Sequence, residues 1–234
     1  TTEIYTLSLL DALPISTSTK NLAKQTGYLI TFEGGEGAGK TTQVKLLATN
    51  LEKAGYQVLI AREPGSTQIA EQIRAIILSP ENEQMAALTE LLLYQAARAQ
   101  VYTQVVLPAL KAGKIVLMDR SIDSSVVYQG MVRQMGIALV EQLNDIATLG
   151  RRPNLTFILD VPVEVGFGRI ARRSLDRLEQ AGEKFHQQVR QGYLSLLQKQ
   201  PQEKRFVLID GARSPAEIHQ QVNKLVQQLC GREK

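Results

Sequence analysis

The chain has very little cysteine, histidine or tryptophan: its 234 residues include one cysteine, two histidines and no tryptophan. A single cysteine, Cys230, cannot form a disulfide within the chain, which is typical of proteins from a reducing compartment. With only His186 and His219 besides, a zinc site built from cysteine and histidine is implausible. A Ser-His-Asp hydrolase would depend on one of two histidines that lie in helical patterns, so we set that class aside as well.

Long apolar runs and blocks of basic residues are also missing. No stretch approaches the roughly 18 uninterrupted apolar residues that a membrane-spanning helix requires. The net charge is +4, but the sequence has no run of five or six basic residues. The excess charge is therefore better explained by the phosphates of a small substrate than by nucleic acid. We expect a cytoplasmic protein that binds neither a membrane nor nucleic acid.

Residues 1–26 do not resemble the rest of the chain. Their apolar part contains Asp11 and Pro14, follows no basic segment and ends in a polar Ser/Thr tract, unlike a secretory signal peptide. Residues 7–16 resemble translated sequencing-adapter contamination, and a natural disordered extension is the alternative. In either case we expect the folded part to be 27–234, a single domain.

From residue 28 onward, β-rich apolar runs alternate with helical patterns. The strand candidates are 28–33, 57–61, 114–118, 155–160 and 205–209. The helix candidates are about 40–54, 67–78, 86–111, 121–133, 137–149, 162–200 (which we expect to be broken) and 215–230. This alternation predicts an α/β fold, a five-stranded parallel sheet with helices on both faces and ligands at the carboxyl ends of the strands. We expect 166–182, which contains glycines and arginines, to be an inserted element.

The most informative pattern is a G-x-x-x-x-G-K-[ST] sequence at residues 34–41, between a strand candidate and a helix candidate. In a phosphate-binding loop of this kind, backbone N–H groups and a helix N-terminus surround a polyphosphate. The Lys40 ammonium can reach the β- and γ-phosphates, and the Thr41 hydroxyl can ligate Mg²⁺. The residues expected to hold the triphosphate are Gly34, Gly35, Glu36, Gly37, Ala38, Gly39, Lys40, Thr41 and Thr42. The sequence thus predicts binding of a nucleoside triphosphate.

Charged residues follow the second and third strand candidates, at the edge where ligands are expected. Asp119 can hold Mg²⁺ or its water opposite the loop, and Arg120 can clamp a phosphate. An aspartate that caps the next helix is the alternative for Asp119. Glu63 lies in the segment 62–65. The proline and glycine of this segment explain a turn without any function, but a turn does not require the charged residues Arg62 and Glu63.

Two further patterns lie on predicted helices. Tyr94 and Arg98 are four residues apart and share a face, so they could recognise a nucleobase, with the ring stacking on it and the arginine donating a hydrogen bond. A Tyr–Arg contact at the helix surface is the alternative. Four arginines recur at intervals of three or four residues: Arg169, Arg172, Arg173 and Arg177. This spacing predicts a basic stripe on one side of a helix. In a mobile lid, such an arginine can stabilise a transferring phosphoryl group; a solvated basic face is the alternative.

Together these segments resemble the bacterial thymidylate kinase family, P-loop enzymes that transfer the γ-phosphoryl group of ATP to dTMP. The resemblance runs from about Tyr28 to the C-terminal helix. Five segments carry it: 32–43, 62–65, 89–98, 119–130 and 175–179. It implies a nucleoside monophosphate kinase fold with a small helical lid, Mg²⁺ as the cofactor, ATP and dTMP as substrates, and a homodimer.

The resemblance also implies roles for single residues. The residues expected to bind dTMP are Glu36 and Glu63 at the 3′-hydroxyl, Tyr94 and Arg98 at thymine, Ser125 and Gln129 at the opposite base edge, and Arg74 and Arg120 at the phosphate. The family supplies its catalytic arginine either from the phosphate loop or from the lid. Because Ala38 stands where loop-type enzymes have arginine, the resemblance assigns this role to Arg169, Arg172 or Arg173, alongside Lys40 and Arg120.

The chain departs from the family pattern at Ser121, which stands where Tyr, His or Phe usually follows Asp-Arg. This change could loosen the monophosphate pocket or alter base discrimination. A kinase for another nucleoside monophosphate is an alternative, although the Gly-x-Pro-Gly-x-Gly-Lys loop of adenylate and UMP/CMP kinases is missing. A nucleotide-dependent switch protein is another, although the Asn-Lys-x-Asp guanine reader of GTPases is missing too.

Overall fold

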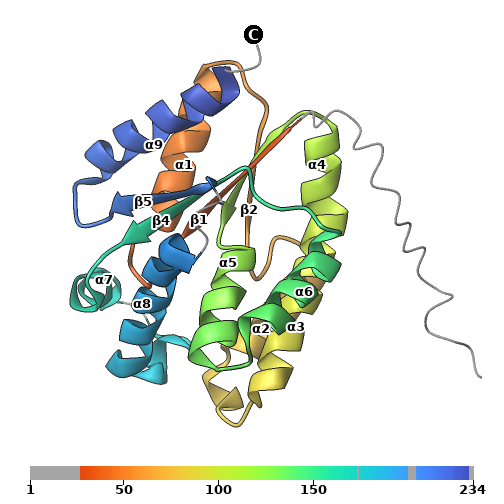
Figure 1. The fold of residues 1–234 in the computed structure, drawn as a ribbon, viewed down its shortest axis with the longest axis vertical. Coiled ribbons are helices and arrows are strands. Elements are labelled where there is room, and N and C mark those ends of the chain that lie inside the picture. The colour runs from red at the N-terminus through yellow and green to blue at the C-terminus, as the bar shows by residue number, and fades with distance from the viewer. Residues whose placement is uncertain (1–26, 173, 200–203, 232–234) are drawn as a thin grey trace, which may run out of the picture.

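The computed structural model describes residues 27–172, 174–199 and 204–231, so the expected leader 1–26 lies outside the described residues. Five strands form one parallel sheet in the order β2-β3-β1-β4-β5 (Figure 1). They are β1 (Tyr28–Glu33), β2 (Val58–Arg62), β3 (Ile115–Asp119), β4 (Leu155–Asp160) and β5 (Phe206–Asp210). All five strand predictions are confirmed to within one residue at each end, and so is the predicted α/β fold.

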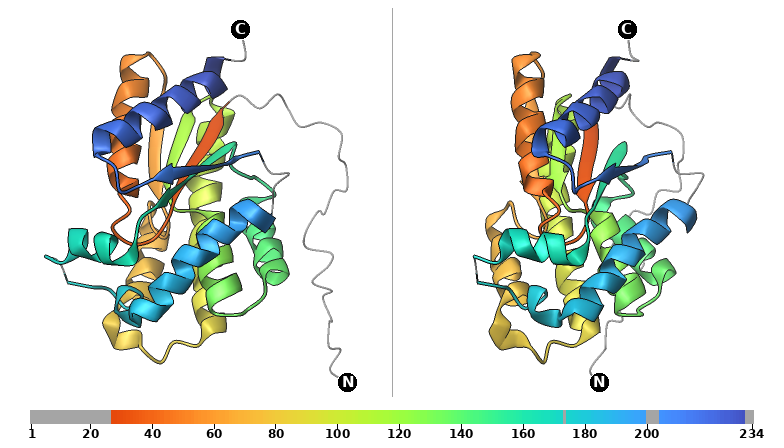
Figure 2. Two further views of the ribbon diagram at one scale, coloured as in Figure 1. Left: turned by 60° about the vertical axis from the view of Figure 1, so that its left-hand side comes forward. Right: turned by 90° about the vertical axis from the view of Figure 1, so that its left-hand side faces the viewer.

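Helices cover both faces of this sheet (Figure 2). They are α1 (Lys40–Lys53), α2 (Gln68–Leu78), α3 (Ala87–Val101), α4 (Leu107–Lys111), α5 (Ile122–Ser125), α6 (Ile137–Thr148), α7 (Val163–Ile170), α8 (Glu183–Lys199) and α9 (Pro215–Cys230). The helices α1 and α9 pack on one face, while α3, α4 and α8 contribute to the apolar clusters of the other face. No helix of the described segments is long and apolar enough to cross a membrane.

The central strand β3 is apolar from Ile115 to Met118 because both of its faces are buried. In β3, Ile115 and Leu117 join the cluster that contains the buried side chains of α1 and α9. The alternate residues Val116 and Met118 join the cluster of α3 and α4. Successive side chains of a strand point to opposite faces, so a continuous apolar run is the pattern expected of a parallel sheet covered on both sides.

Three of the predicted helices are interrupted. The candidate 86–111 is divided by a π-helical segment, Tyr102–Val106, before α4. The candidate 121–133 is the short α5 followed by a π-helical segment, Val126–Val132. The expected break in 162–200 is confirmed, since α7 ends at Ile170 and α8 begins at Glu183.

Candidate active site

A cavity of about 560 Å³ lies at the carboxyl ends of the strands. Its volume is within the range of small-ligand sites. The predicted site residues that line it are Glu36, Gly37, Ala38, Gly39, Lys40, Thr41, Thr42, Glu63, Arg74, Tyr94, Arg98, Asp119, Arg120, Ser125, Gln129 and Arg169. The structure therefore brings residues 36–42 of the phosphate loop and all eight predicted acceptor-binding residues to one cavity, while Gly34 and Gly35 do not line it.

The phosphate loop is closed around its own lysine and packs directly on α7. Lys40 Nζ donates hydrogen bonds to the carbonyl oxygens of Gly34 at 3.0 Å and Gly35 at 2.6 Å. A Cβ atom at Gly37, whose φ is +66°, would lie 2.0 Å from the carbonyl oxygen of Gly166 in α7. Glycine at 37 thus provides a left-handed backbone and also permits this close approach. The contact gives Gly166 a packing role at the base of the expected lid.

Three charged side chains of the loop region determine its electrostatics. Arg120 Nη2 donates to Glu36 Oε1 at 2.5 Å, and the Tyr128 hydroxyl donates to the same oxygen at 3.1 Å. Burial acts to raise the pKa of Glu36, but Arg120 and Lys40 outweigh it and lower that pKa to about 2. Burial lowers the pKa of Lys40 to about 8, with Arg120 acting in the same direction. Glu36 is therefore ionised at neutral pH and holds Arg120 beside the loop.

One pair of oxygen-bearing side chains in the cavity has the chemistry of a magnesium site. The Thr41 hydroxyl, from the first turn of α1, donates a hydrogen bond to Asp119 Oδ2 at the end of β3. Both side chains line the cavity. Hydroxyl and carboxylate oxygens are ligands that Mg²⁺ accepts, so these residues fit a divalent cation next to the loop.

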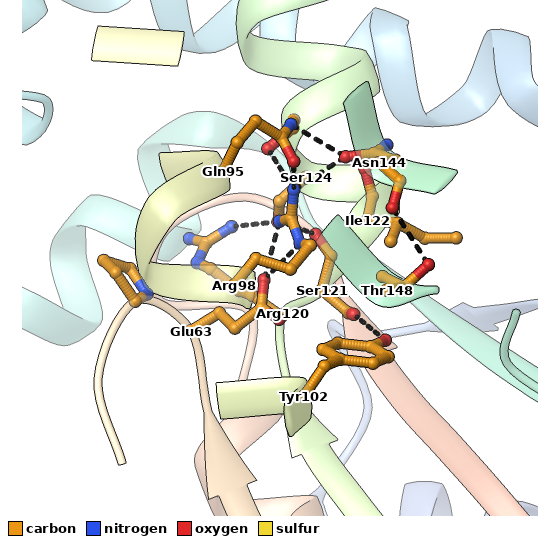
Figure 3. A network of polar contacts seen from close by, with 12 residues as sticks. Glu63, Gln95, Arg98, Tyr102, Arg120, Ser121, Ile122, Ser124, Asn144 and Thr148 are labelled. Carbon is orange, nitrogen blue, oxygen red and sulfur yellow. Dashed lines mark hydrogen bonds and ion pairs between the residues drawn. The ribbon is translucent and has the colours of Figure 1, made fainter. Parts of the chain in front are cut away.

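Arg98 occupies the centre of a buried polar network (Figure 3). Its side chain is only 1% exposed and forms an ion pair with Glu63 Oε2 through Nη2 at 2.6 Å and Nε at 2.8 Å. Its Nη1 donates to Ser125 Oγ, Gln95 Oε1 and Asn144 Oδ1. The alternative of a Tyr–Arg contact at the helix surface is wrong, because the guanidinium faces buried acceptors. Direct contact of Arg98 with thymine stays a prediction.

Ser121 is integrated into the same network and leaves no polar group unpaired. Its hydroxyl lies 2.9 Å from the Tyr102 hydroxyl, its carbonyl oxygen accepts from Arg98, and its N–H donates to Glu33 Oε1 at 2.7 Å. The residue is fully buried. These contacts argue against the loosened pocket that the departure at Ser121 suggested.

The remaining acceptor-side residues are held by neighbours within the protein. Arg74 Nη1 donates to the carbonyl oxygen of Pro64 at 2.9 Å. Gln129 is buried, and its Nε2 donates to Glu90 Oε1 at 3.0 Å. Tyr94 is half-buried on the cavity wall, one turn of α3 before Arg98.

The predicted basic stripe on one helix face is wrong, because α7 ends at Ile170. Arg169 lines the cavity and donates to the carbonyl oxygens of Gly37 at 3.2 Å and Gly211 at 3.0 Å. Arg172 is exposed in the turn that follows, and Arg173 lies outside the described residues.

Arg177 has a different role from the other arginines of that pattern. It is buried, forms an ion pair with Glu90 Oε2 at 2.7 Å, and donates from Nε to the carbonyl oxygen of Ile77 at 2.8 Å. Because Glu90 belongs to α3 and Ile77 to α2, these contacts attach the end of the stretch 166–182 to both helices. Only a helix continued past Ile170 would have placed Arg177 in a common stripe with Arg169.

Several residues of the site were not predicted. Glu33 ends β1 and accepts hydrogen bonds from Ser124 Oγ at 2.6 Å and the Tyr193 hydroxyl at 2.9 Å. Its position, a carboxylate at the end of a buried strand, is a signal that could have identified it. Gln95 and Asn144 carry no such signal, since both are single polar residues within helical patterns.

The sheet has the order β2-β3-β1-β4-β5, and the phosphate loop follows its central strand β1. The loop and the Thr41–Asp119 pair line the same cavity as a wall of arginine and tyrosine side chains. This combination defines a P-loop kinase of the nucleoside monophosphate kinase type. The family model of thymidylate kinase matches residues 32–222. The chain belongs to the thymidylate kinase family.

Individual relatives agree with this assignment. The chain is 47% identical over 207 residues to a thymidylate kinase of Geotalea uraniireducens, covering 86% of this chain and 96% of that protein. It is 47% identical over 208 residues to one of Pseudomonas fluorescens, covering 88% and 98%. A solved thymidylate kinase structure from Ehrlichia chaffeensis aligns with a TM-score of 0.69 and 32% identity, covering 86% of this chain and 99% of that one.

Proposed function

We propose that the protein is an ATP-dependent dTMP kinase, which transfers the γ-phosphoryl group of ATP to dTMP and releases dTDP and ADP. The observation that carries this proposal is the single cavity that contains both the phosphate loop and the buried Glu63–Arg98 network. Family membership supplies the identity of the acceptor, and the shared cavity supplies the proximity that transfer requires.

In the proposed reaction, a phosphate oxygen of dTMP attacks the γ-phosphorus of ATP in line, and the bond to the bridging oxygen of ADP breaks. No side-chain nucleophile is required. Lys40 and Arg120 neutralise charge on the phosphates. Both side chains already lie at the loop, because each donates a hydrogen bond to the carbonyl oxygen of Gly34. Positioning and charge neutralisation are thus the contributions of the protein.

The proposed cofactor is Mg²⁺, bound with ATP by Thr41 and Asp119. The hydrogen bond between these two side chains supports the assignment, because it places both oxygens within reach of one ion. When bound, the ion would neutralise phosphate charge. Removal of divalent ions with EDTA should abolish turnover, and Mg²⁺ should restore it.

We further propose that 27–234 acts as one kinase domain, with 166–182 as a lid that brings its arginines to the γ-phosphoryl group. Arg169 is the best supported candidate because it already lines the cavity beside the Gly37 carbonyl. Arg172 and Arg173 remain the alternative sources of this charge. Single alanine variants should separate them, since the catalytic arginine should lower kcat far more than the other two.

For the acceptor, we propose that Arg74 and Arg120 bind the phosphate of dTMP and that Glu36 and Glu63 lie near its deoxyribose. Tyr94 would stack on thymine. Its half-buried position on the cavity wall supports this role. Ser125, Gln129 and Arg98 would form the edge of the base pocket, as their places on the same wall support.

A cytoplasmic homodimer is the proposed assembly. Large apolar side chains are exposed on α3, at Leu88 and Leu92, and on α6, at Leu139 and Ile146. These two helices pack on each other, and association of two copies would remove such side chains from water. Sedimentation equilibrium should give twice the chain mass.

The experiment that tests the proposed function is a coupled ADP-release assay with ATP and Mg²⁺ and one of dTMP, dUMP, UMP, CMP or AMP. We expect the largest stimulation with dTMP. A larger response to another monophosphate would identify a different kinase. If no monophosphate stimulates ADP release, a nucleotide-dependent switch replaces the kinase proposal.

A further inference from the structure

Glu33, the last residue of β1, is fully buried and is not among the residues that line the cavity. Its Oε1 accepts from the Ser121 N–H at 2.7 Å, while its Oε2 accepts from the Ser124 hydroxyl at 2.6 Å and the Tyr193 hydroxyl at 2.9 Å. Ser121 and Ser124 belong to the network drawn in Figure 3. Each of the three partners also adjoins Arg120, which does line the cavity.

The backbone of Arg120 has the left-handed conformation, with a φ of +68°. A residue with a Cβ atom is uncommon in this region and stays there only where its surroundings stabilise it. Its own N–H donates to the carbonyl oxygen of Phe32 at 2.9 Å. The next N–H, that of Ser121, donates to Glu33 Oε1. The Phe32 carbonyl is present whatever the side chain, so of these two bonds only the second depends on a side chain.

Glu33 also orients the hydroxyl groups beside the Arg120 guanidinium. The oxygens of Ser124 and Tyr193 each lie 3.4 Å from Arg120 Nη1. Both hydroxyls donate to Glu33 Oε2, which leaves their lone pairs for a guanidinium that can only donate. The Nη2 side of the guanidinium is paired with Glu36. The Glu33 carboxyl therefore influences both the backbone and the side chain of Arg120.

The contact between Glu33 and the Ser121 N–H does not require an ionised carboxyl. Burial raises the pKa of Glu33 to about 7, and the charge of Asp123 acts in the same direction, against the hydrogen bond from Ser124 and the charge of Arg120. When Oε2 carries a proton, Oε1 can still accept from Ser121. The backbone of Arg120 is thus stabilised by either form, and a neutral side chain with an oxygen acceptor should replace the carboxyl.

We propose that Glu33 is a positioning residue, which stabilises the left-handed backbone of Arg120 and thereby directs its guanidinium at the phosphate of the acceptor nucleotide. This inference rests on the proposed function for the identity of that nucleotide. Glu33 itself lies behind the cavity wall and touches no ligand. Loss of its carboxyl should therefore weaken the contact with the phosphate and leave binding of the nucleoside part unchanged.

The test is titration calorimetry with dTMP and with thymidine, which lacks the phosphate. Glu33→Met has a similar length and no oxygen acceptor. It should weaken dTMP binding at least about tenfold, the loss expected for charge-assisted hydrogen bonds to a phosphate. Its thymidine affinity should change less than about twofold. Glu33→Gln retains an oxygen for the Ser121 N–H and should bind dTMP within about threefold of the wild type.

Thr31→Val is the matched control. Thr31 is fully buried in β1, two residues before Glu33, and its hydroxyl pairs with Thr156 at 2.8 Å rather than with Arg120. This variant should keep the wild-type ratio of dTMP to thymidine affinity. A merely structural role of Glu33 would weaken dTMP and thymidine binding equally in Glu33→Met, and that result would overturn the inference.

A double variant tests whether Glu33 acts through Arg120. Arg120→Met alone should weaken dTMP binding at least about tenfold. Adding Glu33→Met should weaken it less than about twofold further, because the group that Glu33 positions is already absent. Independent, additive losses would also overturn the inference. If Glu33→Met does not fold, Glu33→Ala takes its place in both comparisons; if neither folds, Glu33 is a structural residue and the inference fails.

A crystal structure of the Glu33→Met protein supplies a readout that needs no ligand. The backbone of Arg120 should leave the left-handed region, and retention of a φ near +68° would refute the proposed role. The two proposals can therefore fail separately. A wild-type protein that binds no dTMP would refute the kinase proposal, while the conformation of Arg120 in the variant would still decide the role of Glu33.

Discussion

The buried ion pair between Arg98 and Glu63 should be the most sensitive polar contact of the acceptor wall. The two side chains are 1% and 3% exposed. Glu63 Oε1 already has no hydrogen-bond partner in the described part of the chain. Arg98→Met retains most of the side-chain length but would leave the Glu63 carboxylate buried without a cation. Breaking a buried pair from one side costs about 3–5 kcal/mol in the free energy of unfolding.

Thermal and urea unfolding of Arg98→Met measures this cost. At about 2–4 °C per kcal/mol for a chain of this size, Tm should fall by about 6–20 °C. The matched control is Arg62→Met, because the Arg62–Glu71 pair has side chains 44% and 42% exposed. Exposed pairs contribute about 0–1 kcal/mol, so the control should stay close to the wild type.

The double variant Arg98→Met/Glu63→Leu should be more stable than Arg98→Met alone, because both buried charges are then absent.

The stability of Arg98→Met should also depend on pH, with a definite sign. Burial raises the pKa of Glu63, with Arg98 opposing the rise, so removal of Arg98 raises it further. A raised carboxyl pKa favours the folded state at low pH, and this stability is lost as pH rises through that pKa. Arg98→Met should therefore be more destabilised at pH 8 than at pH 5. A loss below about 1 kcal/mol, or the opposite pH trend, would refute this account of the pair.

Three further predictions concern the phosphate loop. Lys40→Ala should abolish dTMP-dependent ADP release while Tm stays near the wild-type value; near-normal turnover would remove Lys40 from the reaction. Because burial lowers the pKa of Lys40 to about 8 and bound phosphates would raise it, ATP binding should take up a proton above pH 8. ATP affinity measured by calorimetry should thus decrease from pH 7 to pH 9, and a constant affinity would contradict the assignment. Gly37→Ala places a Cβ 2.0 Å from the Gly166 carbonyl oxygen in a left-handed conformation, so it should weaken ATP binding at least about tenfold; Gly168→Ala, whose Cβ would meet nothing within 4 Å, is its control.

Local patterns in the sequence were sufficient to predict the fold and the part of the site that binds the triphosphate. The five strands are short runs of mostly apolar residues, because the central strands are buried on both faces of the sheet, and such runs are visible without a structure. The phosphate loop depends on glycines, Lys40 and Thr41 within eight consecutive residues, so its geometry is encoded locally. Positions at strand ends also identified Glu63, Asp119 and Arg120, because the carboxyl ends of parallel strands meet at one edge.

The tertiary structure alone decided which distant side chains pair. Helical spacing suggested that Arg177 shares a face with Arg169, but α7 ends at Ile170 and Arg177 instead pairs with Glu90, 87 positions away in the sequence. The interpretation of Arg98 changed in the same way. Its spacing from Tyr94 indicated a shared face, whereas its burial and its contacts with Glu63 and Asn144 depend on how β2, α3 and α6 pack. A hydrogen bond requires its partners at about 3 Å with the correct donor and acceptor facing each other, and residue spacing within one helix contains no information about the element packed against it.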